Sequence, residues 1–303
     1  MNFTEKILGC HPLPGNNKDL EKVLTDEFAE YNCDVNTDAL GNIFFTKKFG
    51  EGKNIMLCTP SDVPGVVAVY ADKSRIYVGE LGGVNIQRLA NCKVVFDGAS
   101  GIFTVPSSTA SIGDCYVETY DEKAQEKVNL GDKGYFDMPV YSLESGIYSG
   151  YGVPAKMCVV TLTKWAHKLL SQDGEKEIAK DGIGSVTFAF LGQSSLMSRG
   201  AFVASYGVNP DVCILLSSVN ASKVTPEVKK DVKYVVKMLD KAYVCDTALT
   251  ESICRYFDDN KINFAKTINA DVNPALNGLS RAETTPTCGE ICVPVFGDEA
   301  VIE

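Results

Sequence analysis

The segment Gln193–Ala201, with the sequence QSSLMSRGA, decides how the rest of this chain is interpreted. It follows Ser185–Leu191, whose alternating apolar residues predict a buried or half-buried strand. It continues into Gly200–Ala204, a run of small residues that predicts the start of a helix. Open α/β sheets place their functional groups in loops at the carboxyl ends of strands. This loop, however, offers two serines, an amide and an arginine, and it has no carboxylate.

The composition predicts an acidic globular protein. The 303 residues are 45% hydrophobic and 22% charged, and 29 basic against 39 acidic residues give a net charge of -10. Nucleic acids and anionic membranes both select basic surfaces, so we expect neither as a partner. No run approaches the ~20 apolar residues that span a bilayer, and the first residues lack a signal-peptide pattern. The eleven cysteines, mostly in apolar runs, are typical of free buried thiols in a reducing compartment, so we expect a cytoplasmic protein.

Apolar periodicity on both sides of residues 64–150 predicts alternating strands and helices. Within 64–150, short β-rich runs follow one another with no convincing helix between them, which predicts a small barrel or sandwich. We therefore expect an α/β domain formed by residues 1–63 and 151–303, with a mainly parallel mixed sheet flanked by helices. The remaining residues, 64–150, would form an inserted β domain. The individual segments are helices at 17–31, after 151 and from 246 or 247, and strands at 35–47 (a pair), 53–58, 66–71, 75–78, 92–96, 101–105, 115–119, 185–191, 211–216, 262–267 and 290–295.

Five segments, including Thr285–Thr287 and Ile291–Pro294 near the carboxyl end, resemble the glutamyl aminopeptidase, or tetrahedral aminopeptidase, family of peptidases with two metal ions. Asp38–Ile43 is similar to the family's D-x-L-G-N segment, and Gln193–Ala201 is similar to its Q-E-E-V-G-L-R-G-A loop. Asn209–Leu216 is similar to the strand that follows, and the resemblance extends over almost the whole chain. It implies a zinc-aminopeptidase type of α/β fold and an insert that mediates dimerisation. It also implies self-association, for which we expect a dimer and leave a dodecamer open.

The first half of the family's metal site does not carry over to this sequence. That site binds two divalent metals, such as zinc or cobalt, through histidines and carboxylates. The resemblance places Pro60 at a ligand histidine and Val63 at a glutamate, and it keeps only Asp62. The bridging aspartate falls on Ala155 or Lys156, and neither residue is a carboxylate. A lysine at this place would repel a metal ion.

The second half of the site is lost as well. Ser194 and Ser195 stand at the general base and the neighbouring glutamate ligand, and Ser217 stands at a further aspartate. Neither histidine of the chain, His11 or His167, falls on a ligand position. The resemblance therefore implies vestigial catalytic and metal positions, no metal cofactor, and a catalytically inactive homologue with a binding, regulatory or structural role.

Two alternatives remain at the same place. An active hydrolase with a remodelled cleft would need Asp62, Lys156 and Ser194 to converge within hydrogen-bond reach. The old metal pocket would otherwise bind a peptide or small molecule without turning it over. The candidate ligand cleft is formed by Asp62, Lys156, Ser194, Ser195, Arg199 and Ser217.

Three smaller features have simpler explanations. Cys288 and Cys292 have a metal-like spacing, but no second pair accompanies them, so we expect core packing. Gly82-Gly83 predicts a turn. The acidic residues Asp298, Glu299 and Glu303 predict a solvated tail.

Overall fold

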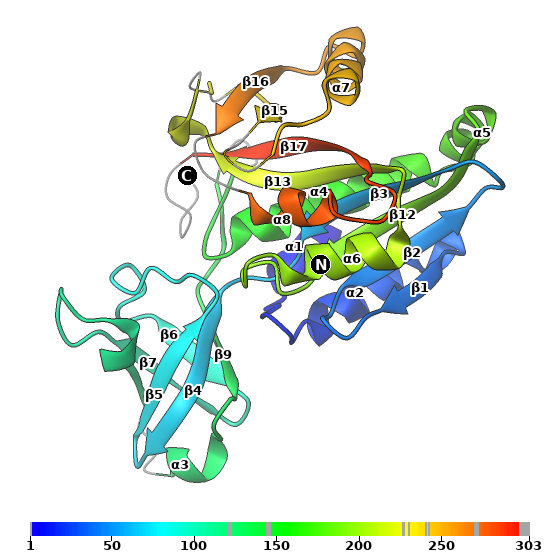
Figure 1. The fold of residues 1–303 in the computed structure, drawn as a ribbon. Helices are drawn as coiled ribbons and strands as arrows, with labels where there is room; N and C mark the ends of the chain where they lie inside the picture. The colour runs from blue at the N-terminus through cyan, green and yellow to red at the C-terminus, as the bar shows by residue number, and fades with distance from the viewer. Residues whose placement is uncertain are drawn as a thin grey trace.

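The computed structural model contains a nine-stranded mixed sheet covered by helices and a separate six-stranded barrel, seen at the lower left of Figure 1. It describes residues 2–119, 123–143, 147–225, 228–229, 231–239, 241, 243–269 and 273–296. Asp298, Glu299 and Glu303 therefore lie outside the described residues. None of the helices in the described chain combines the length and the apolar character that crossing a bilayer requires.

The large sheet has the strand order β1-β2-β12-β3-β13-β17-β15-β16-β14. Its centre, β12-β3-β13-β17, is parallel, whereas β2–β12 and β17–β15 pair antiparallel. The prediction of a mainly parallel sheet is therefore only half right. Antiparallel pairs form where a short turn returns the chain, as between β1 and β2. The strands are β1 (Asp34–Thr37), β2 (Ile43–Lys48), β3 (Lys53–Pro60), β12 (Ile183–Leu191), β13 (Val212–Asn220), β14 (Val224–Thr225), β15 (Tyr234–Leu239), β16 (Phe264–Asn269) and β17 (Thr287–Val295).

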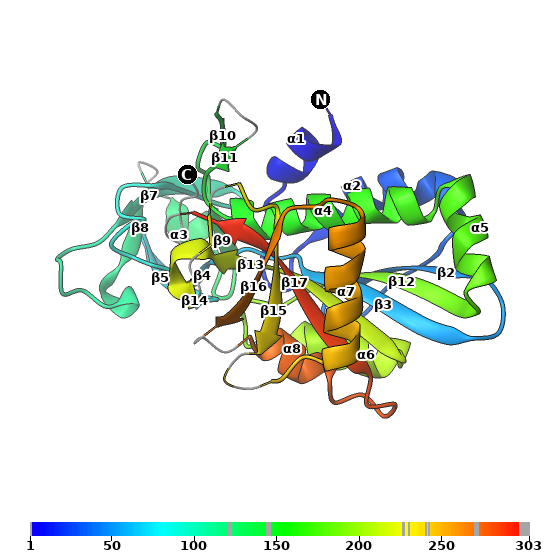
Figure 2. The same cartoon turned by 90° about the horizontal axis from the view of Figure 1, so that it is seen from above.

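Helices cover both faces of this sheet, and Figure 2 shows α4 on one side with α6 and α8 on the other. The α4 face holds the largest apolar cluster, in which stacked Phe28 and Phe45 meet Phe188 and Phe190. The predicted cap at Asp246 is confirmed, because its carboxylate accepts the Leu249 N–H at 2.8 Å. The helices are α1 (Phe3–Leu8), α2 (Lys18–Phe28), α4 (Val153–Leu169), α5 (Gln172–Lys180), α6 (Arg199–Val208), α7 (Thr247–Asp259) and α8 (Pro274–Leu279).

The smaller domain is a closed barrel with the order β4-β5-β8-β7-β6-β9, so the barrel alternative is correct. Its interior is filled by apolar side chains that alternate along the strands, among them Val66, Ile76 and Phe103. The short helix α3 (Ala124–Lys127) lies within this region, which corrects the expectation of no helix there. The strands are β4 (Gly65–Asp72), β5 (Arg75–Leu81), β6 (Lys93–Phe96), β7 (Ala99–Thr104), β8 (Tyr116–Glu118) and β9 (Lys133–Phe136), and a hairpin of β10 (Tyr141–Ser142) and β11 (Tyr148–Ser149) leads to α4.

The chain passes between the two domains at 61–64 and again before α4. The Tyr151 hydroxyl donates to the Pro64 carbonyl at 2.9 Å, which ties these two connections together. Gly152 precedes α4 with φ 71°, and a Cβ built there would lie 2.5 Å from a Val63 methyl group. Only glycine fits this close approach without strain. The junction is therefore a packed contact between the domains.

Candidate functional site

The loop between β12 and α6 is held in place by its own backbone and by one buried amide. Asn42, which is fully buried, accepts the Gly192 N–H at 2.8 Å and donates to the Gly200 carbonyl at 3.0 Å. The Ser194 hydroxyl donates to the Leu191 carbonyl at 2.6 Å. Asn42 belongs to the segment that resembled the family's D-x-L-G-N motif, so this motif has a direct structural role here. It fixes the two ends of the loop.

Asp62, which follows the end of β3, binds the loop between β12 and α6 to that end of the strand. Its carboxylate accepts the Ser194 N–H at 2.8 Å through Oδ1 and the Ser195 hydroxyl at 3.0 Å through Oδ2. The residue is 4% exposed. Burial raises the pKa of Asp62, and the hydrogen bonds from Ser194 and Ser195 offset part of that rise because they stabilise the ionised form. Three of the six predicted cleft residues therefore do converge.

A barrel loop closes over this point. Gly82 has φ +82°, and a Cβ built on it would lie 2.6 Å from the Ser195 hydroxyl oxygen. The predicted Gly82-Gly83 turn thus packs directly against the β12–α6 loop. Ser195 has no space beside it in this direction for a larger side chain.

Ser217 lies in a different polar cluster, at the carboxyl half of β13. Its hydroxyl donates to Glu290 Oε1 at 2.6 Å, and the same oxygen accepts the Asn273 amide at 2.7 Å. Glu290 Oε2 faces the ammonium of Lys237 at 2.7 Å, and these two side chains are 0% and 3% exposed. Ser217 is therefore bound to a buried ion pair and does not face Asp62.

This ion pair is the feature that sequence reasoning missed. Lys237 follows Val235-Val236 on β15, and Glu290 alternates with Gly289 and Ile291 on β17. A charged residue inside an apolar run was the available signal. Its partner was invisible, because β15 and β17 pair across a long stretch of chain.

Lys156 and Arg199 do not belong to the hydrogen-bonded group that Asp62 forms with Ser194 and Ser195. The Lys156 ammonium donates to the Leu8 carbonyl at 2.9 Å, and burial lowers the pKa of Lys156 to about 8. Arg199 is exposed at the first residue of α6, and Pro60 ends β3 opposite Leu191. The convergent set of Asp62, Lys156 and Ser194 required for the remodelled hydrolase is therefore only two-thirds assembled.

The two histidines serve packing contacts elsewhere. His167 contacts the Tyr31 hydroxyl through Nδ1, and its Nε2 lies 3.1 Å from a Glu27 carboxylate oxygen. The His11 ring stacks on Tyr135 with centroids 4.0 Å apart. Neither contact brings a histidine to the positions that the family resemblance assigned to ligands.

The described side chains do not fit the dinuclear metal site of the family that the sequence resembles. Among the described residues, no group of three or more His, Cys, Asp or Glu side chains is arranged to hold a metal ion. Zinc sites need three or four such donors, and Asp62 already accepts two hydrogen bonds from serines. Cys288 and Cys292 are fully buried free thiols on β17, as the core-packing interpretation expected.

A cavity of about 270 Å³ opens between the barrel and the α/β domain. None of the six predicted cleft residues is among those that line it. Its walls come from both domain connections, from the start of α4 and from the ends of β13 and β17. The lining residues are Val63, Pro64, Gly83, Asn85, Tyr151, Gly152, Pro154, Ala155, Ser218, Asn220 and Val295.

Comparisons with known proteins agree on the fold. No protein-family model matches the chain. It is 26% identical, over 80% of its own length and 74% of the relative's, to a protein of Acetivibrio thermocellus named "Putative aminopeptidase". A TET aminopeptidase from a marine sediment thaumarchaeon superposes with a TM-score of 0.85 at 15% identity, over 98% of this chain and 89% of that chain. The Pyrococcus horikoshii TET1 peptidase gives 0.83 at 18% identity, over 99% and 93%. The chain therefore has the fold of the TET aminopeptidases.

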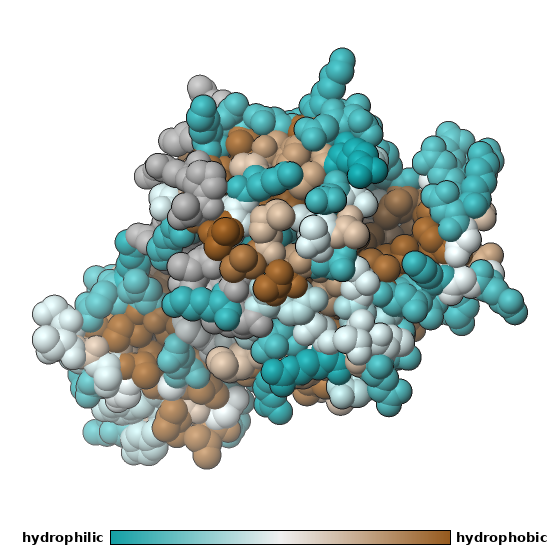
Figure 3. Space-filling model, turned by 45° about the horizontal axis from the view of Figure 1, so that its top comes forward, coloured by the Kyte–Doolittle hydropathy of each residue, from teal (hydrophilic) through white to brown (hydrophobic). Residues whose placement is uncertain are grey.

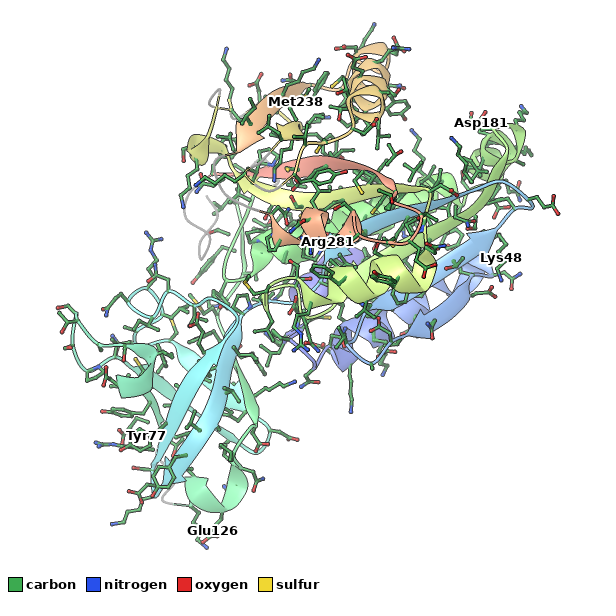
Figure 4. All side chains as sticks on the ribbon, in the orientation of Figure 1. Lys48, Tyr77, Glu126, Asp181, Met238 and Arg281 are labelled. Atoms are coloured by element: carbon green, nitrogen blue, oxygen red, sulfur yellow. The ribbon has the colours of Figure 1, made fainter. Side chains whose placement is uncertain are left out.

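Replacing Lys237 with methionine is expected to destabilise the fold by about 3–5 kcal/mol, because it leaves the Glu290 carboxylate buried without a counter-charge. Urea unfolding measures the free energy of unfolding. The double variant Lys237→Met/Glu290→Gln should recover most of the loss, since the amide carries no charge. The control is Lys48→Met, which removes an exposed pair with Asp34 and should change little (Lys48 is labelled in Figure 4). A double variant as unstable as the single one would contradict the charge argument.

Replacing Asp62 with asparagine is expected to raise stability relative to wild type increasingly as the pH rises. The pKa of Asp62 is raised by burial, so the folded chain holds its proton to higher pH than the unfolded chain does. The free energy of unfolding of the wild type therefore decreases as the pH rises from the pKa of Asp62 in the unfolded chain through its pKa in the folded chain. Urea unfolding of both proteins from about pH 4 to pH 8 measures the difference.

Asp34→Asn removes an exposed carboxylate and serves as the control for this comparison. Its difference from wild type should depend far less on pH. A difference between Asp62→Asn and wild type that stays constant across the range would show that burial does not penalise the ionised carboxylate.

Proposed function

We propose that this chain is an aminopeptidase homologue that does not hydrolyse peptides with metal ions and that acts through ligand binding and self-association. Its fold and its similarity to an aminopeptidase homologue support the relationship. One observation supports the loss of activity. The residues at the vestigial positions form hydrogen bonds within the protein, and those bonds occupy the groups that a metal or a substrate would need.

The occupied groups lie in three separate places. Asp62 is bound by the loop serines, the Lys156 ammonium by a carbonyl near α1, and Ser217 by Glu290. A glutamate at position 195 would also meet the Gly82 turn of the barrel. Restoring one ligand would therefore not restore a site, because the surrounding structure has closed around the present residues.

The remodelled hydrolase has less support. Asp62 and Ser195 are hydrogen-bonded, but a serine nucleophile also needs a base oriented by a third group and donors for the oxyanion. Lys156, the candidate base, donates instead to Leu8. We therefore retain the binding role as the proposal.

Self-association is supported by the relatives and by the surface of the barrel. The Pyrococcus horikoshii TET1 peptidase assembles into a tetrahedron or a large octahedral shell, and a dodecamer of it has been solved. Hydrophobic residues gather on the barrel surface in Figure 3, and Val69 and Tyr70 on β4 are 52% and 59% exposed. Exposed apolar patches of this kind mark protein interfaces. We propose at least a dimer in which the barrel takes part.

The proposed inactivity predicts no turnover of leucine, glutamate or alanine anilides after incubation with Zn²⁺, Co²⁺ or Mn²⁺. Release of the chromophore measures hydrolysis, and an active metallo-aminopeptidase assayed in parallel confirms that the substrates and metals are competent. Hydrolysis that a chelator abolishes and added metal restores would refute the proposal.

The proposed interface predicts that Val69→Asp/Tyr70→Asp lowers the molar mass in solution, because two charges cannot be buried at a contact without counter-ions. Light scattering coupled to size-exclusion chromatography measures the mass. The matched control is Val203→Asp/Tyr206→Asp, which places the same charges on exposed positions of α6. A wild-type monomer at micromolar concentration, or an unchanged mass in the barrel variant, would contradict this assignment.

A further inference from the structure

Residues 10–16, between α1 and α2, cross the junction between the two domains. The Pro12 carbonyl accepts the Val63 N–H at 2.8 Å, at the connection from β3 to the barrel. The Lys133 ammonium of β9 donates to the Pro14 carbonyl at 2.8 Å. We call this segment the N-terminal strap, since it belongs to the α/β domain and is bonded to the barrel.

Two side chains of the strap pack against the barrel. A Cβ built on Gly65, the first residue of β4, would lie 2.5 Å from a methyl carbon of the buried Leu13. The half-buried His11 ring stacks on Tyr135 of β9, with centroids 4.0 Å apart and planes 16° from parallel. Burial raises the pKa of Tyr135, so its phenol stays neutral near pH 6. His11 is therefore the group of this contact whose ordinary pKa lies between pH 5 and 8.

A buried cation lies close to the His11 ring. His11 and Lys156 line the same void of about 10 Å³, which is about the volume that one water molecule needs. Lys156 is 5% exposed, and burial lowers its pKa to about 8, so its ammonium is still charged near pH 6. Burial raises the pKa of the neighbouring Cys10 to about 12, so this thiol brings no negative charge. A protonated His11 would therefore lie beside a buried like charge.

Carboxylates compensate for these effects only in part. Asp19 of α2 accepts the backbone N–H of His11. Asp137 follows β9, and its carboxylate pairs with the Lys93 ammonium at 2.7 Å. Burial and, next, the Lys156 ammonium lower the pKa of His11 from its ordinary value of 6.5. The two carboxylates raise it, but the net direction is downward, so the closed strap favours the neutral imidazole.

We propose that the N-terminal strap is an acid-sensitive clasp, in which protonation of His11 releases residues 10–16 from β9 and loosens the barrel from the α/β domain. The closed form carries a neutral ring stacked on Tyr135. The released ring gains water and moves away from the Lys156 ammonium. The two chain connections remain tied to each other, and they keep the barrel attached. The clasp does not depend on whether the chain hydrolyses peptides.

Acid favours release, because a released His11 binds a proton more readily than a closed one. The released ring titrates near its ordinary value of 6.5, whereas the closed strap binds the proton only at lower pH. Above about pH 6.5 the ring is neutral in both forms, and the closed form keeps its full stability. As the pH falls below that value, the released form gains a proton that the closed form does not, so the closed form loses stability.

The Val63 amide reports on the strap, because its N–H is bonded to the Pro12 carbonyl. Hydrogen exchange of the full chain is followed by NMR at pH 5.5 and pH 7.5 and corrected for the intrinsic exchange rate. Protection of this amide in the wild type should fall roughly threefold or more at pH 5.5. His11→Phe keeps an aromatic ring on Tyr135 without a titrating group, and its protection should be equal at the two pH values.

Two further variants separate charge from packing. His11→Gln is neutral and cannot stack, so its protection should be lower than that of the wild type at pH 7.5 but independent of pH. It serves the same purpose if His11→Phe does not fold. His167→Gln removes the other histidine of the chain and is the matched control, which should lose protection at pH 5.5 as the wild type does.

A fall in protection at pH 5.5 as large in His11→Phe or His11→Gln as in the wild type would overturn the proposal. A wild type without any such fall would overturn it as well. NMR titration of the two histidine rings adds an independent result, and the pKa of His11 should lie below 6.5. A value at or above 6.5 would show that the stacked tyrosine and the carboxylates hold the cation, and the clasp would then not open in acid.

Discussion

The buried carboxylate of Asp62 is the interaction on which the site depends. It joins the end of β3 to the β12–α6 loop through two serine hydrogen bonds, at the point where the chain leaves for the barrel. The free-energy cost of burying this charge is offset only in part by those bonds, which is why its pKa is raised. In a dinuclear site, metal ions would supply the missing positive charge. Here hydrogen bonds from two serines stabilise the carboxylate in part.

The second polar cluster of the site meets the same requirement, which is that buried polar groups need partners. Ser217 and Asn273 bond to Glu290, whose charge is balanced by Lys237. The strand β15 that carries Lys237 also contains Met238, labelled in Figure 4. The charge of Glu290 is thus balanced by the Lys237 ammonium. A cavity at the domain junction remains open, and none of the six predicted cleft residues lines it.

Sequence patterns predicted the regular elements well where apolar periodicity was strong. The strands ending at Pro60 and Leu191 and the cap at Asp246 were found in this way. The strands β9 and β15 were missed, since Lys133 begins the first and Lys237 interrupts the second. The β1–β2 hairpin was predicted, but the antiparallel pairs β2–β12 and β17–β15 were not, because periodicity says nothing about the direction in which strands pair.

The site was predictable in part. The family resemblance placed Ser194, Ser195 and Asp62 in one cleft, and the structure joins them by hydrogen bonds where the carboxyl ends of the adjacent parallel strands β3 and β12 meet. Lys156 and Ser217 were predicted in the same cleft, but their side chains contact other groups. The direction of a side chain depends on packing. Lys156 lies on α4 and reaches back to α1, and Ser217 faces Glu290. Sequence spacing does not contain that information.

The most direct measurement of the central claim is the number of metal ions bound per chain. The protein is equilibrated with excess Zn²⁺, freed of loosely bound ion by gel filtration, and analysed for zinc by mass spectrometry of the elements. An active dinuclear aminopeptidase treated in the same way is the reference. The closed polar clusters predict far less than one zinc per chain. Two zinc ions per chain, lost when Asp62 is replaced by alanine, would contradict the account.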